Sequence, residues 1–466
     1  MKLTIEGLNN TIDIERLFNA FFSFENEETN IEANIIIRDE TVSIAIYKDN
    51  EKVYYVNKTV IDDKKENKRM IKRSLFKGLV CSTQKVLPWG IITGIRPIKI
   101  PIGLLKKGYT EEAVRKELKE QYLITDDKIN MMLNIAKEEL KVLSRYHERD
   151  YSIYIGIPFC PTRCLYCSFP SYPIDQSLDI SDLYLEALEK EITFVANRYK
   201  KKQLKTLYIG GGTPTTLTEK QLEKLINIIK AKLDLSQLDE WTVEAGRPDS
   251  INFNKLRTLK EAGVTRISIN PQSMNQETLN RIGRKHTTLD IEKAFKDART
   301  LGFDNINMDL IIGLPQETSN EVENTLKQVK RLDPDSITIH SLAIKKGSQL
   351  KEELDDYNQI SNKEIIKIQS LIQDYVKEKD LIPYYLYRQK KIVGNLENVG
   401  YAKKDKISRY NILIMEEQQT IIGMGAGAIT KMVDSKNNKI NRIENVKNVN
   451  DYINRIDEMI NRKQAL

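Results

Sequence analysis

Apolar runs alternate with amphipathic stretches along the middle of the chain. Six short apolar runs are each followed by a stretch in which apolar residues recur at spacings of three and four, the period of a helix. We predict the first of these helices to begin at Ser181 or Asp182, whose side chains suit an N-cap. The predicted strands are Tyr151–Ile157, Thr206–Ile209, Trp241–Ala245, Arg266–Ile269, Ile306–Ile312 and Ser336–Ile339. The pattern predicts an α/β fold in which a parallel sheet curls into a partial (β/α)6 barrel of the TIM type.

Residues 1–147 lack this repeated pattern and open with a short mixed region. A basic run at Lys64–Arg73 is expected to form one exposed helix face, and the Gly and Pro density of Pro88–Pro97 predicts an ordered loop. No catalytic constellation lies in this part, so we expect an N-terminal accessory α+β domain of unknown role. The charged stretch His147–Asp150 marks its boundary with the barrel, which we assign to residues 148–345.

Residues 346–466 combine a helix with short alternating segments. The helix is expected over Asn362–Lys379. The alternating segments are Pro383–Tyr387, Arg409–Glu416 and Thr420–Met424. They predict a small sheet in a C-terminal α+β domain that forms a lid or substrate domain for the barrel. Gly423–Ile429 is expected to turn with close backbone approach, because no Lys, Ser or Thr follows at the spacing of a phosphate-binding loop.

Composition and charge narrow the class of protein. The chain has 466 residues, with 73 Lys and Arg against 66 Asp and Glu, and its net charge of +7 is spread along its length. Basic and aromatic residues form no continuous stripe, so we expect no nucleic-acid partner. No apolar run approaches the ~20 residues of a membrane span, and no signal-peptide pattern is present. We therefore expect a cytoplasmic enzyme without a membrane span, acting as a monomer.

Three of the four cysteines lie within eight residues, directly after the first predicted strand. Cys160, Cys164 and Cys167 have the spacing C-x3-C-x2-C. Three thiolates on one loop can bind three irons of a four-iron cluster and leave the fourth iron open to an exogenous chelating ligand. The alternatives are a zinc site completed by a distant His, although closed zinc sites favour C-x2-C pairs, and a disulfide, which a chain of this length does not need. Cys81 stands apart among apolar neighbours and is expected to be a small buried residue.

Other polar signals follow the later strands, and in a parallel barrel the chemistry gathers at the carboxyl ends of the strands. Gly210–Thr215 follows the second strand, Glu244 ends the third, Gln272 follows the fourth and Asp309 lies in the fifth. Taken singly, each has an ordinary explanation: a tight turn for the glycines, rim polar groups for Glu244 and Gln272, and a helix-surface cation for Arg284. Their joint order after the cysteine loop supports the interpretation of an active site.

Together these segments resemble a known family. Gly156–Tyr172, with the sequence GIPFCPTRCLYCSFPSY, and the segments Tyr384–Gln389 and Gly394–Tyr401 resemble the radical S-adenosylmethionine superfamily. Within it they resemble the anaerobic coproporphyrinogen III oxidase group and its HemZ branch. The superfamily resemblance covers about residues 151–345, and the group resemblance extends to about residue 430.

The resemblance implies a reaction. A deoxyadenosyl radical, released when S-adenosylmethionine is cleaved, takes a hydrogen from a substrate propionate, and loss of carbon dioxide and one electron leaves a vinyl group. Two such events convert coproporphyrinogen III to protoporphyrinogen IX without oxygen. The implied partners are this tetrapyrrole and an electron donor and acceptor that the sequence does not identify.

The resemblance also implies residue roles. Cys160, Cys164 and Cys167 would bind one 4Fe-4S cluster, whose open iron would chelate S-adenosylmethionine. Tyr154 would be catalytic, near the reacting centre, and Arg284 would pair with a carboxylate. The residues implied in binding one or two S-adenosylmethionine molecules are Tyr154, Tyr166 near the adenine, Gly211, Gly212 and Thr213 near the methionine amino group, Glu244, Gln272, Arg284, Asp309 and Ala343.

The chain departs from the family pattern at three positions. The best-known oxidase carries a further Cys where this chain has Phe169, and a His where it has Gly156. Phe169 is the residue of the haem chaperone branch, but that branch has a His where this chain has Tyr410. A phenol is a less common haem ligand than an imidazole, which weakens a haem-ligand role at this position.

Two other functions therefore stay open. One is a haem-transfer protein of the HemW type, and the other is a radical enzyme acting on another tetrapyrrole, such as a haem-opening methyl transferase. The histidines available to bind haem are His147, His286 and His340. We expect His286 to be a hydrogen-bonding residue of a loop or helix start, and His340, at the end of a strand, to face the substrate space.

Overall fold

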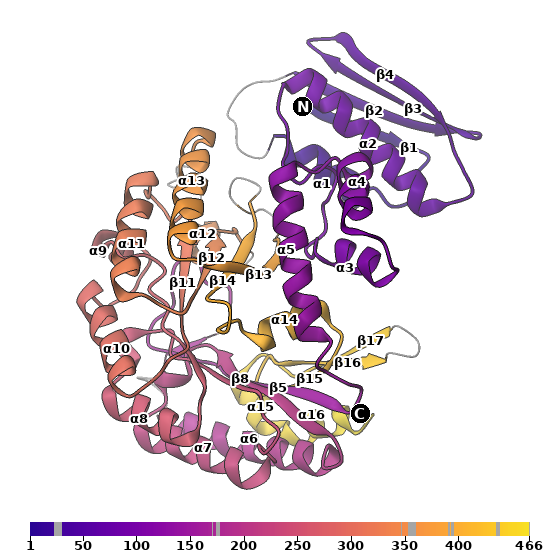
Figure 1. Ribbon diagram of the computed structural model, residues 1–466. Helices are drawn as coiled ribbons and strands as arrows, with labels where there is room; N and C mark the ends of the chain where they lie inside the picture. Colours follow the sequence, from indigo (N-terminus) through magenta and orange to yellow (C-terminus); the bar gives the residue numbers. More distant parts are fainter. Residues whose placement is uncertain are drawn as a thin grey trace. The chain divides into compact units, whose positions relative to one another are not determined.

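In the computed structural model of this protein (Figure 1), the described residues are 1–22, 30–169, 171–173, 178–345, 347–352, 360–389, 392, 396–434 and 439–465. The chain divides into two compact units, Met1–Glu138 with Leu386–Asn395, and Glu139–Tyr385 with Leu396–Leu466. The functional division into an accessory domain, a barrel and a lid stays a prediction. None of the described helices is long and apolar enough to cross a membrane.

The first unit is built on a four-stranded sheet in the order β1-β2-β3-β4. β1 runs parallel to β2, and the other pairs are antiparallel. Its strands and helices are β1 (Lys2–Glu6), α1 (Ile12–Ala20), β2 (Ile31–Arg38), β3 (Thr41–Lys48), β4 (Glu51–Thr59), α2 (Lys64–Thr83), α3 (Lys99–Lys106), α4 (Glu111–Tyr122) and most of α5 (Asp126–Leu143). The core forms where Ile14 of α1 and Leu75 of α2 join Ile35 and Ile44 of the sheet in one buried cluster.

The basic run is not the exposed helix face that we expected. It begins α2, whose N-cap Asp63 accepts hydrogen bonds from the amides of Lys65 and Glu66. Arg69 pairs with Glu117 at 2.9 Å and Arg73 pairs with Glu66 at 2.9 Å. These partners and the sheet cover much of the run, so its arginines form ion pairs within the unit.

Two residues of α2, Lys72 and Cys81, differ from expectation in how exposed they are. Burial lowers the pKa of Lys72 to about 8. Cys81 is exposed, contrary to our expectation. The reason is helical geometry: Ile71, Leu75 and Leu79, four residues apart, form the buried stripe, and Cys81 lies two residues further on, on the opposite side.

The second unit is built on an eleven-stranded sheet in the order β13-β14-β12-β11-β10-β9-β8-β5-β15-β16-β17. The six central strands are β5 (Asp150–Ile157), β8 (Gln203–Gly211), β9 (Glu240–Glu244), β10 (Arg266–Ser268), β11 (Ile306–Ile312) and β12 (Ser336–Ser341). They are all parallel, and each pairs with the next in chain order. The six predicted strands and the α/β fold class are therefore confirmed.

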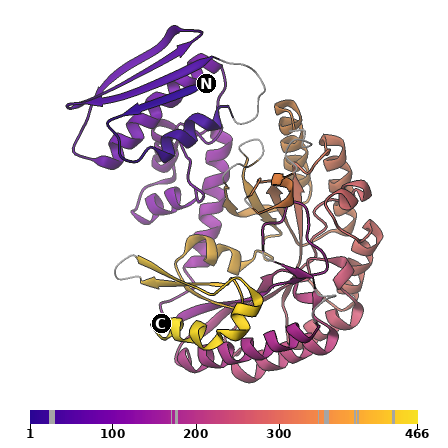
Figure 2. The ribbon, with the colours of Figure 1, turned by 180° about the vertical axis from the view of Figure 1, so that it is seen from behind.

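Helices connect the parallel strands and lie in an arc on the outer side of the sheet (Figures 1 and 2). They are α6 (Leu178–Arg198), α7 (Glu219–Lys232), α8 (Phe253–Ala262), α9 (Gln276–Arg281), α10 (Thr288–Thr300) and α11 (Ser319–Leu332). Thr218, Thr287 and Thr318 each begin a helix with a capping box.

The predicted start of α6 was wrong. The helix begins at Leu178, so Ser181 and Asp182 lie inside it. Their side chains accept hydrogen bonds from Gln221 Nε2 at 2.7 and 3.0 Å, which joins α6 to the start of α7. Ser and Asp are both common N-cap residues, but here the two side chains bind a neighbouring helix instead of capping their own.

The C-terminal strands extend the main sheet and do not form the separate small sheet that we expected. β14 pairs antiparallel with β12, and β15 pairs parallel with β5. The segment Arg409–Glu416, expected to alternate as a strand, is helix α14, capped by Ser408, which accepts from the amide of Asn411. The remaining elements are α12 (Gln349–Glu352), α13 (Asn362–Glu378), β13 (Ile382–Tyr387), β14 (Asn398–Ala402), β15 (Thr420–Met424), β16 (Ile429–Asp434), β17 (Lys439–Glu444), α15 (Val449–Asn454) and α16 (Ile456–Arg462).

A buried ion pair fastens the end of the chain to the sheet. Lys463 Nζ lies 2.7 Å from Glu191 Oε1, and both side chains are fully buried. Glu191 Oε2 accepts hydrogen bonds from the amide of Gly425 at 2.8 Å and from Tyr452 at 2.5 Å. The glycine turn therefore has the predicted close approach: a Cβ on Gly425, whose φ is +95°, would lie 2.4 Å from the carbonyl oxygen of Gly156.

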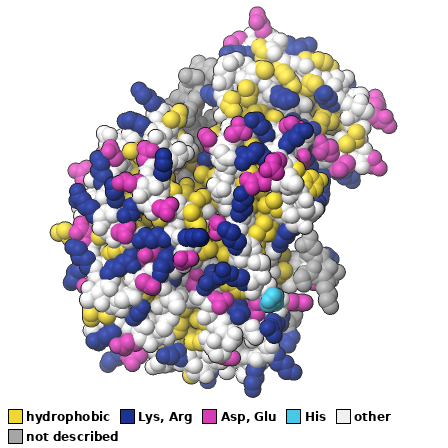
Figure 3. Space-filling model, in the orientation of Figure 1, with side chains coloured by type: hydrophobic (Ala, Val, Ile, Leu, Met, Phe, Trp, Pro, Cys, Tyr) yellow, Lys and Arg dark blue, Asp and Glu magenta, His cyan; other side chains and the backbone are white. Residues whose placement is uncertain are grey.

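On the face shown in Figure 3, basic and acidic side chains are interspersed. This distribution agrees with a net charge of +7 that is spread along the chain.

We predict that Lys463→Met destabilises the protein by about 3 to 5 kcal/mol, because it leaves the Glu191 carboxylate buried without its cation. Urea denaturation followed by circular dichroism measures the loss. The double variant Glu191→Gln with Lys463→Met removes both charges and should recover part of it. Unchanged stability of the single variant would contradict the role given to this pair.

The second prediction concerns pH. Glu139 of α5 is fully buried, and its two carboxylate oxygens have no hydrogen-bond partner in the described parts of the chain. Burial, with the nearby Glu416, raises its pKa well above the usual range. The folded state therefore holds a proton that the unfolded state releases, so stability falls as pH rises above the ordinary Glu value of about 4.3.

Glu139→Gln removes this proton linkage. The melting temperature of the variant, relative to that of the wild type, should rise as the pH is raised from about 4 to about 8, the range above the ordinary Glu value. A difference between the two proteins that stays constant across this range would show that Glu139 does not titrate as described.

Candidate functional site

The cysteine loop leaves the carboxyl end of β5, as predicted. Its first residues form a short strand, β6 (Phe159–Cys160), which pairs with β7 (Tyr172–Pro173). The amide of Cys167 donates to the carbonyl oxygen of Cys164 at 3.0 Å, so the last two cysteines share one turn. Cys164 is buried, whereas Cys160 and Cys167 are partly exposed. The three thiols thus lie on a folded loop outside the strand ends.

The glycine segment after β8 is bonded directly to this loop. The amide of Gly212 donates to the carbonyl oxygen of Ile157 at 2.8 Å, and the amide of Thr213 donates to that of Phe159 at 2.7 Å. A Cβ on Gly212 would lie 2.5 Å from Phe159 O, so no larger residue fits without a shift of the backbone. Thr213 Oγ1 lies 3.6 Å from Cys160 Sγ. The two segments form one backbone cradle.

The donor set fits an iron-sulfur cluster. Burial raises the pKa of the Cys160 thiol to about 11, and the neighbouring Cys164 and Cys167 add to the rise. Among the residues that the structure describes, no three His, Cys, Asp or Glu side chains are grouped to hold a single metal ion. In a four-iron cluster each thiolate binds a different iron, so three thiols need not converge on one metal ion. Binding would deprotonate the thiols.

Tyr166 and Arg284 meet beside the loop. Arg284 Nη2 lies 3.3 Å from the Tyr166 hydroxyl, and its Nη1 donates to the carbonyl oxygens of Asn270 at 2.5 Å and Gly246 at 3.4 Å. These carbonyls follow β10 and β9, so Arg284 is held at the strand ends. Its Nε has no hydrogen-bond partner in the described ranges. Pairing with a ligand carboxylate stays a prediction.

Two carboxylates at the strand ends have opposite pKa shifts. Glu244 accepts a hydrogen bond from Tyr208 at 2.6 Å, and burial raises its pKa to about 7. Burial also acts to raise the pKa of Asp309, but hydrogen bonds led by His340 hold it below the ordinary value. His340 Nε2 lies 3.7 Å from Asp309 Oδ2. Glu244 can therefore take up a proton near neutral pH while Asp309 stays ionised.

Three tyrosines stack near Glu244. The ring centroids of Tyr208 and Tyr410 lie 4.5 Å apart, and Tyr154 lies 6.1 Å from Tyr208 and 6.4 Å from Tyr410. Burial raises the pKa of all three phenols, so they stay neutral. A Cβ on Gly211 would lie 3.3 Å from the Tyr154 hydroxyl, which places that tyrosine against the glycine segment.

Two further predicted site residues follow β10 and β12. The amide of Gln272 donates to the carbonyl oxygen of Asp309 at 2.9 Å. Gln272 has a left-handed backbone, with φ of +68°, and lines a small cavity with Leu310, Glu317 and Leu326. Ala343 is buried just after β12. Their roles toward S-adenosylmethionine stay predictions, as do those of the other binding residues.

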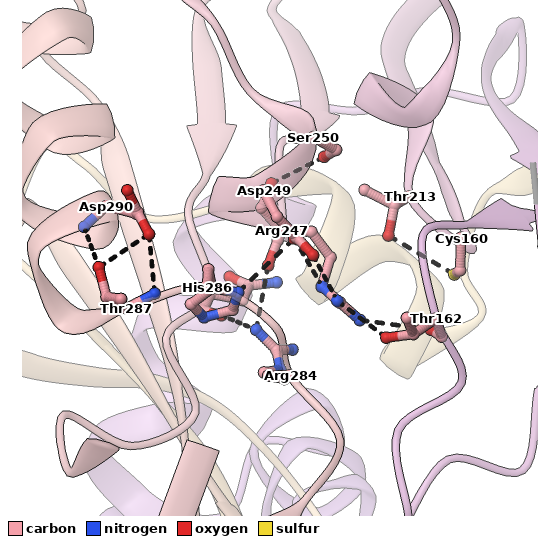
Figure 4. Close-up of polar contacts among 12 residues, drawn as sticks. Cys160, Thr162, Thr213, Arg247, Asp249, Ser250, Arg284, His286, Thr287 and Asp290 are labelled. Atoms are coloured by element: carbon pink, nitrogen blue, oxygen red, sulfur yellow. Dashed lines mark hydrogen bonds and ion pairs between the residues drawn. The ribbon is translucent and has the colours of Figure 1, made fainter. Parts of the chain in front are cut away.

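Sequence reasoning missed Arg247, which contacts the cysteine loop, and Asp249, which pairs with Arg247 (Figure 4). Arg247 Nη1 lies 3.5 Å from Cys164 Sγ, and Asp249 binds Arg247 through both oxygens. A signal was present, because both residues closely follow Glu244 at the carboxyl end of β9. Tyr208 was also missed, and Tyr410 was noted only as a replacement for a histidine. The stacking of these two side chains depends on how α14, which carries Tyr410, packs against β8, which carries Tyr208.

Comparison with known proteins agrees with this arrangement. Residues 154–329 match the family model of the radical SAM superfamily, in which SAM is S-adenosylmethionine. Over 386 residues the chain is 42% identical to the oxygen-independent coproporphyrinogen-III oxidase-like protein HemZ of Bacillus subtilis (strain 168), which covers 82% of this chain and 76% of that protein. Over 194 residues it is 43% identical to the heme chaperone HemW of the same organism, 41% of this chain and 50% of the chaperone.

Among solved structures, coproporphyrinogen III oxidase (HemN) from Escherichia coli, a radical SAM enzyme, matches with a TM-score of 0.54 and 25% identity, covering 69% of this chain and 72% of that one. The family implies a 4Fe-4S cluster and S-adenosylmethionine, which the cysteine loop and its glycine cradle fit. The chain therefore belongs to the radical SAM superfamily, in the coproporphyrinogen oxidase-like group that includes HemZ and HemN.

Proposed function

We propose that this protein catalyses the oxygen-independent oxidative decarboxylation of coproporphyrinogen III propionates to vinyl groups, giving protoporphyrinogen IX. The observation that carries the proposal is the bonded pair of loops after β5 and β8, with three thiols on one and the glycine cradle on the other. The choice of substrate is supported by the relative that is 42% identical and is described as coproporphyrinogen-III oxidase-like.

Cys160, Cys164 and Cys167 would hold the 4Fe-4S cluster, and the backbone of Gly211–Thr213 would meet the S-adenosylmethionine that binds it. When bound, these groups supply the reducing electron and the deoxyadenosyl radical that takes a hydrogen from the substrate propionate. We propose one such molecule at the cluster and a second near Tyr154, with an electron donor and an acceptor still to be identified.

The remaining residues would position groups and hold charge. Arg284, fixed by backbone carbonyls, offers an Nε without a partner in the described structure to a ligand carboxylate. Glu244, whose pKa burial raises to about 7, can donate or accept a hydrogen bond to a ribose or an amino group. The stacked Tyr154, Tyr208 and Tyr410 form a wall of neutral aromatic rings suited to the apolar pyrrole rings of a tetrapyrrole and to the exclusion of water.

A haem-transfer function is the second candidate. Phe169, the residue of the chaperone branch, and the 43% identity to a heme chaperone over half of its length favour it. The histidines are less favourable. The His286 side chain is fully buried beside Asp249, so His340 and the exposed His147 are left to bind a haem. We propose a cytoplasmic, monomeric protein in either case, with residues 1–147 as an accessory domain.

The test is an anaerobic assay of the reconstituted, reduced protein with S-adenosylmethionine and coproporphyrinogen III, with products followed by mass spectrometry. Protoporphyrinogen with deoxyadenosine and carbon dioxide would support the oxidase. Deoxyadenosine with an unchanged porphyrinogen would contradict it and favour haem transfer. S-adenosylhomocysteine with transfer of a methyl group would instead indicate an enzyme acting on another tetrapyrrole.

We predict that Cys164→Ser folds but loses most of its iron and all cleavage of S-adenosylmethionine, because three thiolates are the minimum for this cluster type. Iron per chain, deoxyadenosine formation and the melting temperature are measured together. Cys81→Ser is the matched control, since Cys81 is exposed on the first unit, and it should keep wild-type iron content. Full activity of Cys164→Ser would refute the cluster assignment.

Phe169→Cys tests the position at which the chain departs from the best-known oxidase. The Phe169 side chain is 57% exposed, two residues after Cys167, and offers apolar surface to the pyrrole rings of the substrate. We predict unchanged iron content and a KM for coproporphyrinogen III raised about tenfold, the effect of about 1.4 kcal/mol of lost apolar contact. Phe169→Leu keeps most of the apolar area and should stay near the wild type. Loss of iron in Phe169→Cys would place the residue in cluster binding instead.

A further inference from the structure

A buried chain of Arg247, Asp249 and His286 reaches the cysteine loop from the carboxyl end of β9 (Figure 4). The side chains of Arg247 and His286 are 4% and 0% exposed, and that of Asp249 is 19% exposed. A buried ion pair carries a desolvation penalty, which further hydrogen bonds to the two charged groups must offset. None of the sequence patterns that define the candidate site contains these residues.

Every N–H of the Arg247 guanidinium has a partner. Nη1 donates to the carbonyl oxygen of Thr162 at 3.3 Å and to Cys164 Sγ at 3.5 Å. Nη2 donates to Thr162 Oγ1 at 3.0 Å and to Asp249 Oδ2 at 2.7 Å, and Nε donates to Asp249 Oδ1 at 3.0 Å. The planar fork thus joins the segment between the first two cysteines to Asp249, a geometry that a lysine ammonium cannot reproduce.

Asp249 fixes the direction of that fork through its two hydrogen bonds to Arg247. Asp249 lies in a 3-10 turn, Pro248–Ser250, and Ser250 Oγ donates back to the carbonyl oxygen of Arg247 at 2.7 Å. His286 Nδ1 lies 3.5 Å from Asp249 Oδ1 on the side away from the cysteines. Burial acts to raise the pKa of Asp249, but His286 and Arg247 hold it far below its ordinary range, so the carboxylate is ionised.

We propose that Arg247 is a positioning residue that tunes the iron-sulfur cluster, by a hydrogen bond from its oriented guanidinium to the Cys164 sulfur, with Asp249 balancing its charge. This inference rests on the cluster of the proposed function. Hydrogen bonds to ligand sulfur and nearby charge set the reduction potential of such clusters. A cationic donor stabilises the more negative, reduced state, so it raises the potential.

Substitutions of Arg247 and of Asp249 should shift the reduction potential of the cluster in opposite directions. A merely structural role would not produce this difference in sign. Arg247→Gln removes the cation and should lower the potential. Asp249→Asn keeps the shape of the side chain but leaves the Arg247 charge unbalanced, and should raise it. We expect each variant to move the reduction equilibrium about tenfold, which is about 59 mV for one electron.

The experiment is a redox titration of the reconstituted full-length protein, monitored by electron paramagnetic resonance without S-adenosylmethionine or porphyrinogen. Iron content and melting temperature are measured for each variant, and Arg247→Lys, which keeps the charge but not the fork, should fall between the wild type and Arg247→Gln. Asp249→Asn retains the arginine, so it keeps the test decisive if Arg247→Gln binds no iron.

Potentials equal to the wild type, or shifts of the same sign in Arg247→Gln and Asp249→Asn, would overturn the inference and leave the proposed function standing. A wild-type protein that takes up no four-iron cluster would overturn both. A loaded wild type with the two opposite shifts supports the assignment of Arg247 and Asp249.

Discussion

The close backbone approach between β5 and β8 is the constraint on which the rest of the site depends. In this register Gly156 lies opposite Gly210 and Ile157 lies opposite Gly211. The hydrogen bonds continue past the strands, from the amides of Gly212 and Thr213 to the cysteine loop. Since a Cβ on Gly212 would collide with the loop, glycine is required for the two segments to meet.

The other side of β5 is restrained in a similar way. β15 pairs with it in parallel, and the turn after β15 brings Gly425 against the Gly156 carbonyl. The buried Glu191 holds the amide of Gly425 and is itself paired with Lys463 near the end of the chain. Residues 272 positions apart thus fix the strand that leads into the cysteine loop. Rigid support of this kind lets a loop present ligands in a defined geometry.

The parts of the fold and site that could be predicted are those with a local signal. Apolar runs predicted the parallel strands, and spacing alone singled out the three cysteines as candidate ligands. Helix α14 was misjudged because Tyr410, Ile412 and Leu413 bury one side of a single short amphipathic segment, which over eight residues matches an alternating strand nearly as well. Local pattern cannot separate the two when tertiary packing decides.

The misses at the site have the same origin. Arg247 and Asp249 belong to no spacing motif, and their importance follows from the fold that brings the β9 loop against Cys164. The misplaced cap of α6 was similar, because Ser181 has the right side chain for a cap but is used by Gln221 of a neighbouring helix. Side chains that act through tertiary hydrogen bonds leave little trace in sequence periodicity.

The central claim is that three thiolates on the loop after β5 hold a four-iron cluster with one iron open to S-adenosylmethionine. The most direct measurement is the electron paramagnetic resonance spectrum of the reconstituted, reduced wild-type protein, with and without S-adenosylmethionine. The account predicts the signal of a single reduced four-iron cluster whose shape changes when S-adenosylmethionine is added. A signal that S-adenosylmethionine leaves unchanged would contradict the account, since it would mean that no iron is open to this ligand.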